Sequence, residues 1–265
     1  MKKGNYEMKK IIIAGNWKMN KHKDEALNFV YQINNKVPDR KKIETIIFPQ
    51  TILLDSLTQI EGKNLRIGAQ NVFHKNEGAF TGENSPLSIQ LLGIKYVLLG
   101  HCERRIYFNE TDEMVNLKLL QLLKLNIYPI VCIGEDITVK NENRTKEVLN
   151  EQLEKILANV PSEHMEKIII AYEPFWAIGT GKSVNPEEAN QIIAGVRCKI
   201  ALLFSEKISQ SVRIIYGGST NVYNIESFLT QKEIDGVLAG NSSLKTEDFL
   251  FFTEVASKVL ESKNQ

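Results

Sequence analysis

Short runs of β-branched and aliphatic residues recur along the chain, and each is followed by a longer segment with helical apolar spacing. The runs are nearly continuous in Ile, Val and Leu, as expected for parallel strands that are covered on both faces. Eight strands are predicted, over residues 10–14, 45–48, 65–70, 95–100, 127–133, 167–172, 212–216 and 236–240. Helices are predicted after them, over residues 24–37, 52–61, 86–92, 112–125, 145–160, 186–204, 223–230 and 247–261.

Helix start signals support this alternation. Asn185 supplies a capping side chain, Pro186 suits the first helical position, and Glu187 and Glu188 lie where the helix dipole favours negative charge. No linker rich in Pro, Gly or Ser interrupts the pattern. We therefore expect an α/β fold with one domain over residues 1–265, a closed eight-stranded parallel (βα)8 barrel. An open doubly wound sheet is the alternative.

Composition and charge narrow the classes of partner. The chain carries 33 Lys and Arg against 32 Asp and Glu, for a net charge of +1, and it has no basic block. Nucleic acid and membrane partners are therefore not expected, and no apolar run approaches the roughly 20 residues of a bilayer span. Cys102, Cys132 and Cys198 are widely spaced, and no secretory signal is visible at the N-terminus. A reducing, cytoplasmic location is expected.

Polar residues follow several predicted strands, at the end of a barrel where active sites are built. Asn16 and Lys18 follow the first strand, His101 and Glu103 the fourth, and Glu173 the sixth. Each alone is compatible with a solvated or structural side chain. An acid, an imidazole and an ammonium at one barrel mouth together predict proton abstraction next to a carbonyl, with donors for the enediolate oxygen. The second and fifth strands are expected to contribute less.

Two turns of small residues follow the last two predicted strands. They are Gly217-Gly218-Ser219 and Gly240-Asn241-Ser242-Ser243. Loops at these two places in barrels commonly bind phosphate, so a phosphorylated substrate is predicted. The four histidines show no paired metal-ligand spacing, and a metal is not expected.

Six segments occur in the order of the motifs of one enzyme family. They are AGNWKMN at residues 14–20, GAQN at 68–71, GAFTGE at 78–83, GHCERR at 100–105, AYEPFWAIGTGK at 171–182 and YGGS at 216–219. On these motifs the chain resembles the triosephosphate isomerases along essentially its whole length from Met8. Residues 1–7 match nothing in the family and are expected to be an extension, so that Met1 and Met8 are both candidate starts.

The resemblance implies an isomerase of glycolysis and gluconeogenesis that interconverts dihydroxyacetone phosphate and D-glyceraldehyde 3-phosphate through an enediolate, without a cofactor. Glu173 would be the base, and His101 would be the neutral electrophile for which this family is the known example. Lys18 would neutralise charge, positioned by Glu103, and Asn16 would orient the substrate. Backbone amides for the phosphate would come from Gly179, Ser219, Gly240 and Asn241. Residues 174–182 would form the family's closing lid.

Three residues depart from the family pattern. Cys102 replaces the usual serine, Phe175 replaces a valine of the lid hinge, and Asn241 replaces a glycine of the phosphate turn. The Asn241 side chain adds a Cβ where backbone approaches phosphate, so a modestly weaker phosphate grip is expected.

The segment over residues 71–85 is long for a connection in a barrel and carries Val72, Phe73 and Phe80. The resemblance implies an arm that docks into a second subunit and hence a homodimer; packing within the chain is the alternative. Two other functions stay open from the residues alone. One is a Schiff-base aldolase with Lys18 as nucleophile, and the other is a sugar-phosphate binding protein without catalysis.

Overall fold

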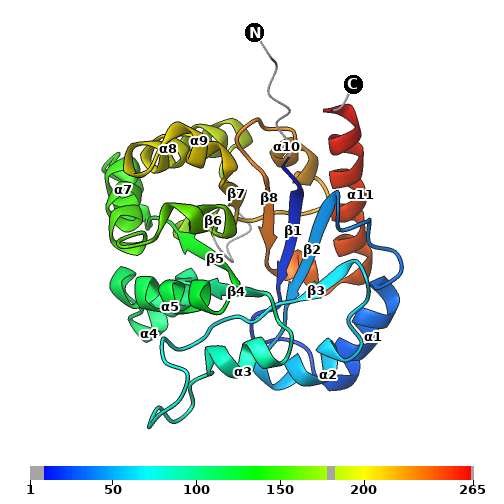
Figure 1. Ribbon diagram of the computed structural model, residues 1–265. Coiled ribbons are helices and arrows are strands. Elements are labelled where there is room, and N and C mark those ends of the chain that lie inside the picture. The colour runs from blue at the N-terminus through cyan, green and yellow to red at the C-terminus, as the bar shows by residue number, and fades with distance from the viewer. Residues whose placement is uncertain (1–8, 178–182, 264–265) are drawn as a thin grey trace.

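The computed structural model describes residues 9–177 and 183–263. Residues 1–7, expected to be an extension, and Gly179 lie outside the described residues. Eight parallel strands form one sheet whose curvature is visible in Figure 1. The strands are β1 (Ile11–Asn16), β2 (Ile43–Phe48), β3 (Leu65–Ile67), β4 (Tyr96–Leu99), β5 (Tyr128–Ile133), β6 (Ile169–Tyr172), β7 (Arg213–Tyr216) and β8 (Gly236–Ala239).

Helices follow the strands and surround the sheet (Figure 1). The α-helices are α1 (Lys23–Ile33), α2 (Leu54–Thr58), α3 (Pro86–Leu91), α4 (Cys102–Phe108), α5 (Asp112–Lys124), α6 (Ile137–Asn141), α7 (Thr145–Ile156), α8 (Pro186–Leu203), α9 (Glu206–Ser211), α10 (Ile225–Leu229) and α11 (Thr246–Ser262). Short 3₁₀ segments are η1 (Thr51–Leu53), η2 (Ser162–Lys167), η3 (Phe175–Ala177) and η4 (Asn241–Leu244). The helices α4, α6 and α9 were not predicted, because one or two turns are too short to show a period.

The sheet runs in the order β3-β2-β1-β8-β7-β6-β5-β4, so β3 and β4 are its two ends. Ala69, just beyond β3, joins them. Its amide donates to the Tyr96 carbonyl at 2.9 Å, and its own carbonyl accepts from the Leu98 amide at 2.9 Å. The parallel (βα)8 barrel predicted from the sequence is therefore confirmed, with a contact of very few residues between the end strands.

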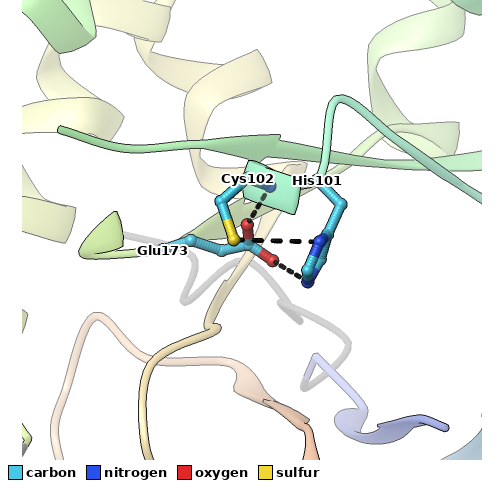
Figure 2. A group of neighbouring side chains, drawn as sticks. All are labelled: His101, Cys102 and Glu173. Atoms are coloured by element: carbon cyan, nitrogen blue, oxygen red, sulfur yellow. Dashed lines mark hydrogen bonds and ion pairs between the residues drawn. The ribbon is translucent and has the colours of Figure 1, made fainter. Parts of the chain in front are cut away.

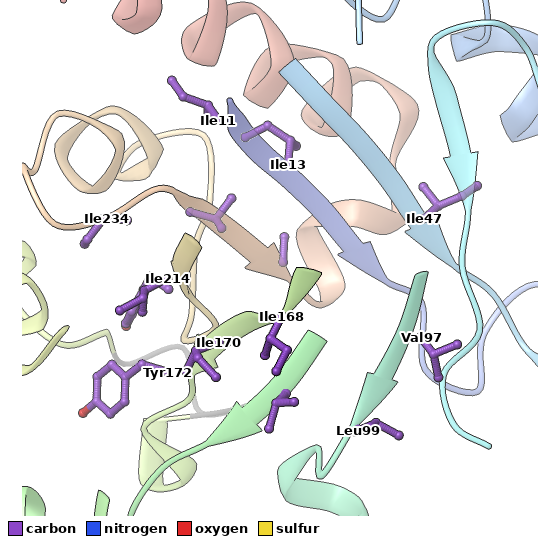
Figure 3. Close-up of a cluster of buried hydrophobic side chains, with 14 of the residues drawn as sticks. Ile11, Ile13, Ile47, Val97, Leu99, Ile168, Ile170, Tyr172, Ile214 and Ile234 are labelled. Atoms are coloured by element: carbon purple, nitrogen blue, oxygen red, sulfur yellow. The ribbon is translucent and has the colours of Figure 1, made fainter. Parts of the chain in front are cut away.

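Alternate residues of each strand enter two different apolar layers. Ile12 packs inside the barrel with residues such as Ile46 and Leu98. Its neighbours Ile11 and Ile13 lie in the layer between the sheet and the helices, part of which is drawn in Figure 3. Because both faces of every strand are buried, both need aliphatic side chains. This explains why the strands read as continuous apolar runs.

The start of α8 follows its predicted signals. Asn185 Oδ1 accepts hydrogen bonds from the amides of Glu187 at 2.8 Å and Glu188 at 3.4 Å, and Pro186 is the first helical residue. This cap fixes the point at which the chain leaves the segment after β6. Among the helices of the described ranges, none has the length and hydropathy needed to cross a membrane.

Candidate active site

A cavity of about 290 Å³ opens at the carboxyl ends of the strands. Its walls combine the polar residues that follow β1, β4 and β6 with the small residues that follow β7 and β8. They are Asn16, Lys18, His101, Glu173, Gly217, Gly218, Ser219, Thr220, Asn221, Leu238, Gly240, Asn241 and Ser242. Segments up to 226 positions apart in the sequence thus share one pocket, as the predicted barrel requires.

The Glu173 carboxylate lies in this pocket with no exposed surface. Its Oε2 accepts a hydrogen bond from the Cys102 amide at 3.1 Å, and its Oε1 lies 3.5 Å from His101 Nε2 (Figure 2). Oε1 has no hydrogen-bond partner among the described residues. Gly217 is needed for this placement, because a Cβ there would come within 2.7 Å of Glu173 Cγ. One carboxylate oxygen is held, and the other faces the cavity residue His101.

His101 is the N-cap residue of α4, and its ring is fixed by that helix. The amide of Glu103 donates to His101 Nδ1 at 3.2 Å, so in the neutral ring Nδ1 carries the lone pair and Nε2 carries the proton. The side chain of Arg105 holds the turn that precedes His101. It donates to the carbonyl of Gly100 at 2.7 Å and to that of Cys132 at 3.1 Å. The arrangement presents an N–H donor to the cavity.

Lys18 reaches the same pocket from the loop after β1. Its Nζ donates to Glu103 Oε1 at 2.6 Å. Its backbone is in the left-handed region, with a φ of 53°, and two side chains hold it there. Asn16 Oδ1 accepts from the Lys18 amide at 3.0 Å, and Gln70 Nε2 donates to the Lys18 carbonyl at 2.8 Å. Glu103 itself lines a neighbouring cavity and touches the pocket through Lys18.

Small residues that follow β7 and β8 form part of the pocket wall. The lining includes Gly217, Gly218, Ser219, Gly240, Asn241 and Ser242 from the two turns singled out in the sequence. Thr220, Asn221 and Leu238 also line it and were not singled out. Asn241 begins the 3₁₀ segment η4, and its φ is outside the left-handed region. Its backbone conformation is therefore available to any L residue, and the exchange of glycine for asparagine imposes no backbone strain.

Glu135, which follows β5, supports this site through hydrogen bonds to residues near Glu173. It was not predicted from the sequence. It is buried and accepts hydrogen bonds at Oε1 from the Tyr172 hydroxyl at 3.1 Å and from Trp176 Nε1 at 3.0 Å. Burial raises the pKa of its carboxyl. Among the described residues, none that follows β2 or β5 lines the pocket, as expected. Glu135 acts from outside the pocket, because it ties the segment after β5 to the one after β6. Its proximity in sequence to a strand end was the available signal.

Two thiols lie close to the carboxylate. Cys102 Sγ is 3.8 Å from His101 Nδ1, and Cys132 is fully buried inside the barrel (Figure 2 shows Cys102). Burial, with a further contribution from the Glu173 charge, raises the pKa of both thiols, so both are protonated at neutral pH. All three cysteines of the chain are free.

The sequence is similar to those of known proteins. The family model described as triosephosphate isomerase matches residues 11–256. The chain belongs to the triosephosphate isomerase family. It is 55% identical over 254 residues to the protein named triosephosphate isomerase of Onion yellows phytoplasma (strain OY-M), covering 96% of this chain and 93% of the relative. The homologue of that name from Aster yellows witches'-broom phytoplasma gives the same figures.

A more distant relative extends the likeness. The triosephosphate isomerase of Clostridium tetani is 44% identical over 248 residues, which cover 93% of this chain and 97% of the relative. These matches cover nearly the full length of this chain and of each relative. The family match over residues 11–256 includes every strand of the barrel.

Proposed function

We propose that the protein interconverts dihydroxyacetone phosphate and D-glyceraldehyde 3-phosphate by proton transfer through an enediolate. Membership of the family supports this reaction. The observation that carries it is the position of Glu173, a fully buried carboxylate with one oxygen held by an amide and the other without a hydrogen-bond partner among the described residues. A buried carboxylate with an available oxygen is suited to accept a carbon-bound proton.

His101 and Lys18 would stabilise the charge that this proton transfer creates. The N–H at His101 Nε2 would donate to the carbonyl oxygen as it becomes an enediolate oxygen, while the ring stays neutral because the Glu103 amide donates to Nδ1. The Lys18 ammonium, oriented by Glu103, would offset negative charge on enediolate and phosphate. Asn16 would position the substrate by keeping Lys18 in its left-handed conformation.

The phosphate would lie against the small residues after β7 and β8. Ser219, Gly240 and Asn241 line the pocket, and backbone amides in turns of small residues are suited to bind a phosphate. Gly179 is proposed from the family motif alone, since it lies outside the described residues.

An aldolase mechanism is less well supported. Schiff-base formation needs a neutral amine with a lone pair, whereas Lys18 donates from its ammonium to a carboxylate at 2.6 Å. A binding protein without catalysis would give no reason for an acid, an imidazole and an ammonium around one cavity.

We further propose a single domain, because one sheet joins strands from residue 11 to residue 239. Three free thiols support a reducing location such as the cytoplasm. A homodimer is proposed through residues 71–85, which form a compact arm projecting beyond α3 in Figure 1. Within it, the rings of Phe73 and Phe80 are in contact, with centroids 4.5 Å apart and an interplanar angle of 40°, and Phe80 keeps 36% of its surface exposed.

The experiment that tests the reaction is a coupled assay. Glyceraldehyde 3-phosphate is supplied, and the formation of dihydroxyacetone phosphate is followed through its reduction. Turnover without added metal or cofactor is expected. Absence of turnover from correctly folded protein would contradict the proposal, and a borohydride-trapped adduct on Lys18 would favour the aldolase.

A further inference from the structure

Cys102 places a third kind of metal-binding group next to two residues of the pocket wall, His101 and Glu173. One ring nitrogen of His101, Cys102 Sγ and one Glu173 oxygen all lie within 4.8 Å of one another, and all three residues are buried (Figure 2). Imidazole, thiolate and carboxylate are the side-chain ligands that Zn²⁺ prefers. The serine usual at position 102 in the family would supply a much poorer zinc ligand.

The separations approach those between the ligands of a tetrahedral zinc ion. With zinc bonds of the usual lengths, sulfur and nitrogen lie about 3.6 Å apart, and nitrogen and oxygen about 3.4 Å apart. Here Cys102 Sγ is 3.8 Å from His101 Nδ1, and Glu173 Oε1 is 3.5 Å from His101 Nε2. One ion can bind only one of these two nitrogens, and in a set with a single nitrogen the three ligand atoms lie within 4.8 Å of one another. Side-chain movements of about 1 Å would therefore bring one nitrogen, the sulfur and a carboxylate oxygen around one ion.

Charge and access also suit a divalent cation. Glu173 Oε1 is buried and lacks a hydrogen-bond partner among the described residues, so it has an acceptor site to offer. The nearby cations are already paired: Lys18 with Glu103 at 2.6 Å and Arg105 with Asp112 at 2.7 Å. His101 and Glu173 line the 290 Å³ cavity, through which an ion and a water for the fourth position could enter.

We infer that His101, Cys102 and Glu173 form an inhibitory binding site for Zn²⁺ and similar thiophilic divalent cations. Coordination releases the Cys102 thiol proton to solvent and takes up the lone pairs of the ring nitrogen and the carboxylate. Use of His101 Nδ1 would replace its contact with the Glu103 amide. The ion would occupy the very groups proposed to act on the triose phosphate, so it is an inhibitor and not a cofactor. The inhibition, though not the binding, rests on the proposed function.

The direct test is titration of the purified protein with Co²⁺, which replaces Zn²⁺ and gives a sulfur-to-metal charge-transfer band when a thiolate binds it. We expect this band in the wild type and in the Cys198→Ser variant, which removes the exposed thiol. We expect no band in the Cys102→Ser or His101→Gln variants, with folding checked by thermal unfolding. A band that survives Cys102→Ser, or that is lost in Cys198→Ser, would overturn the site.

The second test measures the half-inhibitory Zn²⁺ concentration of the wild type and of each variant, each relative to its own activity without Zn²⁺. Loss of an outer-sphere partner of a metal already costs about 10- to 100-fold in affinity, so Cys102→Ser should raise the half-inhibitory Zn²⁺ concentration at least about tenfold. Cys198→Ser should leave it unchanged, and a chelator should restore activity. Equal sensitivity of wild type and Cys102→Ser would refute the site. A Cys102-dependent Co²⁺ band in a protein without isomerase activity would instead reject the proposed function and keep the binding site.

Discussion

The amide of Cys102 and the carboxylate of Glu173 are joined by a hydrogen bond of 3.1 Å across 71 residues of sequence. The bond connects the start of α4 to the segment after β6, and it holds Oε2 while Oε1 faces His101 at 3.5 Å. The proposed base is therefore held in part by a backbone amide from a distant segment of the chain. The position of the Glu173 carboxylate depends on the barrel, which brings the start of α4 next to the segment after β6.

Lys18→Ala should damage both substrate binding and turnover. The ammonium is fixed beside the pocket by Glu103, and its loss removes a charged partner of phosphate and enediolate. A hydrogen bond to a charged group contributes about 1.5–3 kcal/mol, so KM should rise by about 10- to 100-fold. Steady-state kinetics would measure this. Lys155→Ala, which removes an exposed ion pair with Glu113, is the control and should change little; equal effects of both variants would argue against a role for Lys18.

Asn241→Gly should strengthen phosphate binding modestly. The substitution removes a Cβ from the turn that lines the pocket, while the backbone of Asn241 needs no glycine conformation. KM should fall by about two- to tenfold, and the affinity for inorganic phosphate should rise by a similar factor, which is the scale of one neutral hydrogen bond. Unchanged KM and phosphate inhibition would show that asparagine is neutral at this position.

Glu135→Gln should change how stability depends on pH. Burial raises the pKa of the Glu135 carboxyl above its ordinary value of 4.5, so the folded protein holds the proton more tightly than the unfolded chain does. Its contribution to the free energy of unfolding is therefore present at low pH and is lost as pH rises above 4.5. Glutamine keeps an acceptor for Tyr172 and Trp176 but does not titrate.

Urea unfolding at a series of pH values tests this sign. The free energy of unfolding of the wild type minus that of Glu135→Gln should fall as pH increases. Glu147→Gln is a control of opposite sign, because hydrogen bonding to Arg144 lowers the pKa of the exposed Glu147 carboxyl. For that variant the same difference should rise with pH. A flat difference for Glu135→Gln would mean that its carboxyl titrates alike in both states.

The proposed dimer should be sensitive to charge within the arm over residues 71–85. Thr81 is exposed between Phe80 and Gly82, and an arginine there would place a charge in the expected contact. Thr81→Arg should therefore sediment as a monomer at concentrations where the wild type is a dimer. Leu202→Arg, at an 83% exposed position of α8, should stay dimeric. A wild type that is monomeric and fully active would reject the dimer.

The sequence carries enough information to predict the barrel and the residues at its mouth. Continuous Ile/Val/Leu runs indicate strands buried on both faces, and the parallel topology brings Asn16, His101 and Glu173 to the same end. Their positions follow from chain order alone. Their chemical roles remain predictions, because a pocket shared by three side chains does not by itself show which one moves a proton.

The supporting contacts could not be predicted, for a physical reason. Gln70 meets the Lys18 carbonyl across 52 residues, and Glu135 meets Trp176 across 41. Such hydrogen bonds depend on the register of neighbouring strands and on side-chain rotamers, neither of which is encoded in apolar spacing. The helix α4 was not predicted, because its seven residues span only two turns and are too few to show a helical period.

The most direct test of the central claim is the turnover of Glu173→Gln in the coupled assay. The amide keeps the size of the carboxylate and an acceptor for the Cys102 amide, but it cannot accept the substrate proton. General-base catalysis accelerates a reaction by about 10²- to 10⁴-fold, so kcat should fall by at least that factor. The free energy of unfolding and the affinity for phosphate should be unchanged. A Glu173→Gln variant that keeps wild-type kcat would show that another group removes the proton.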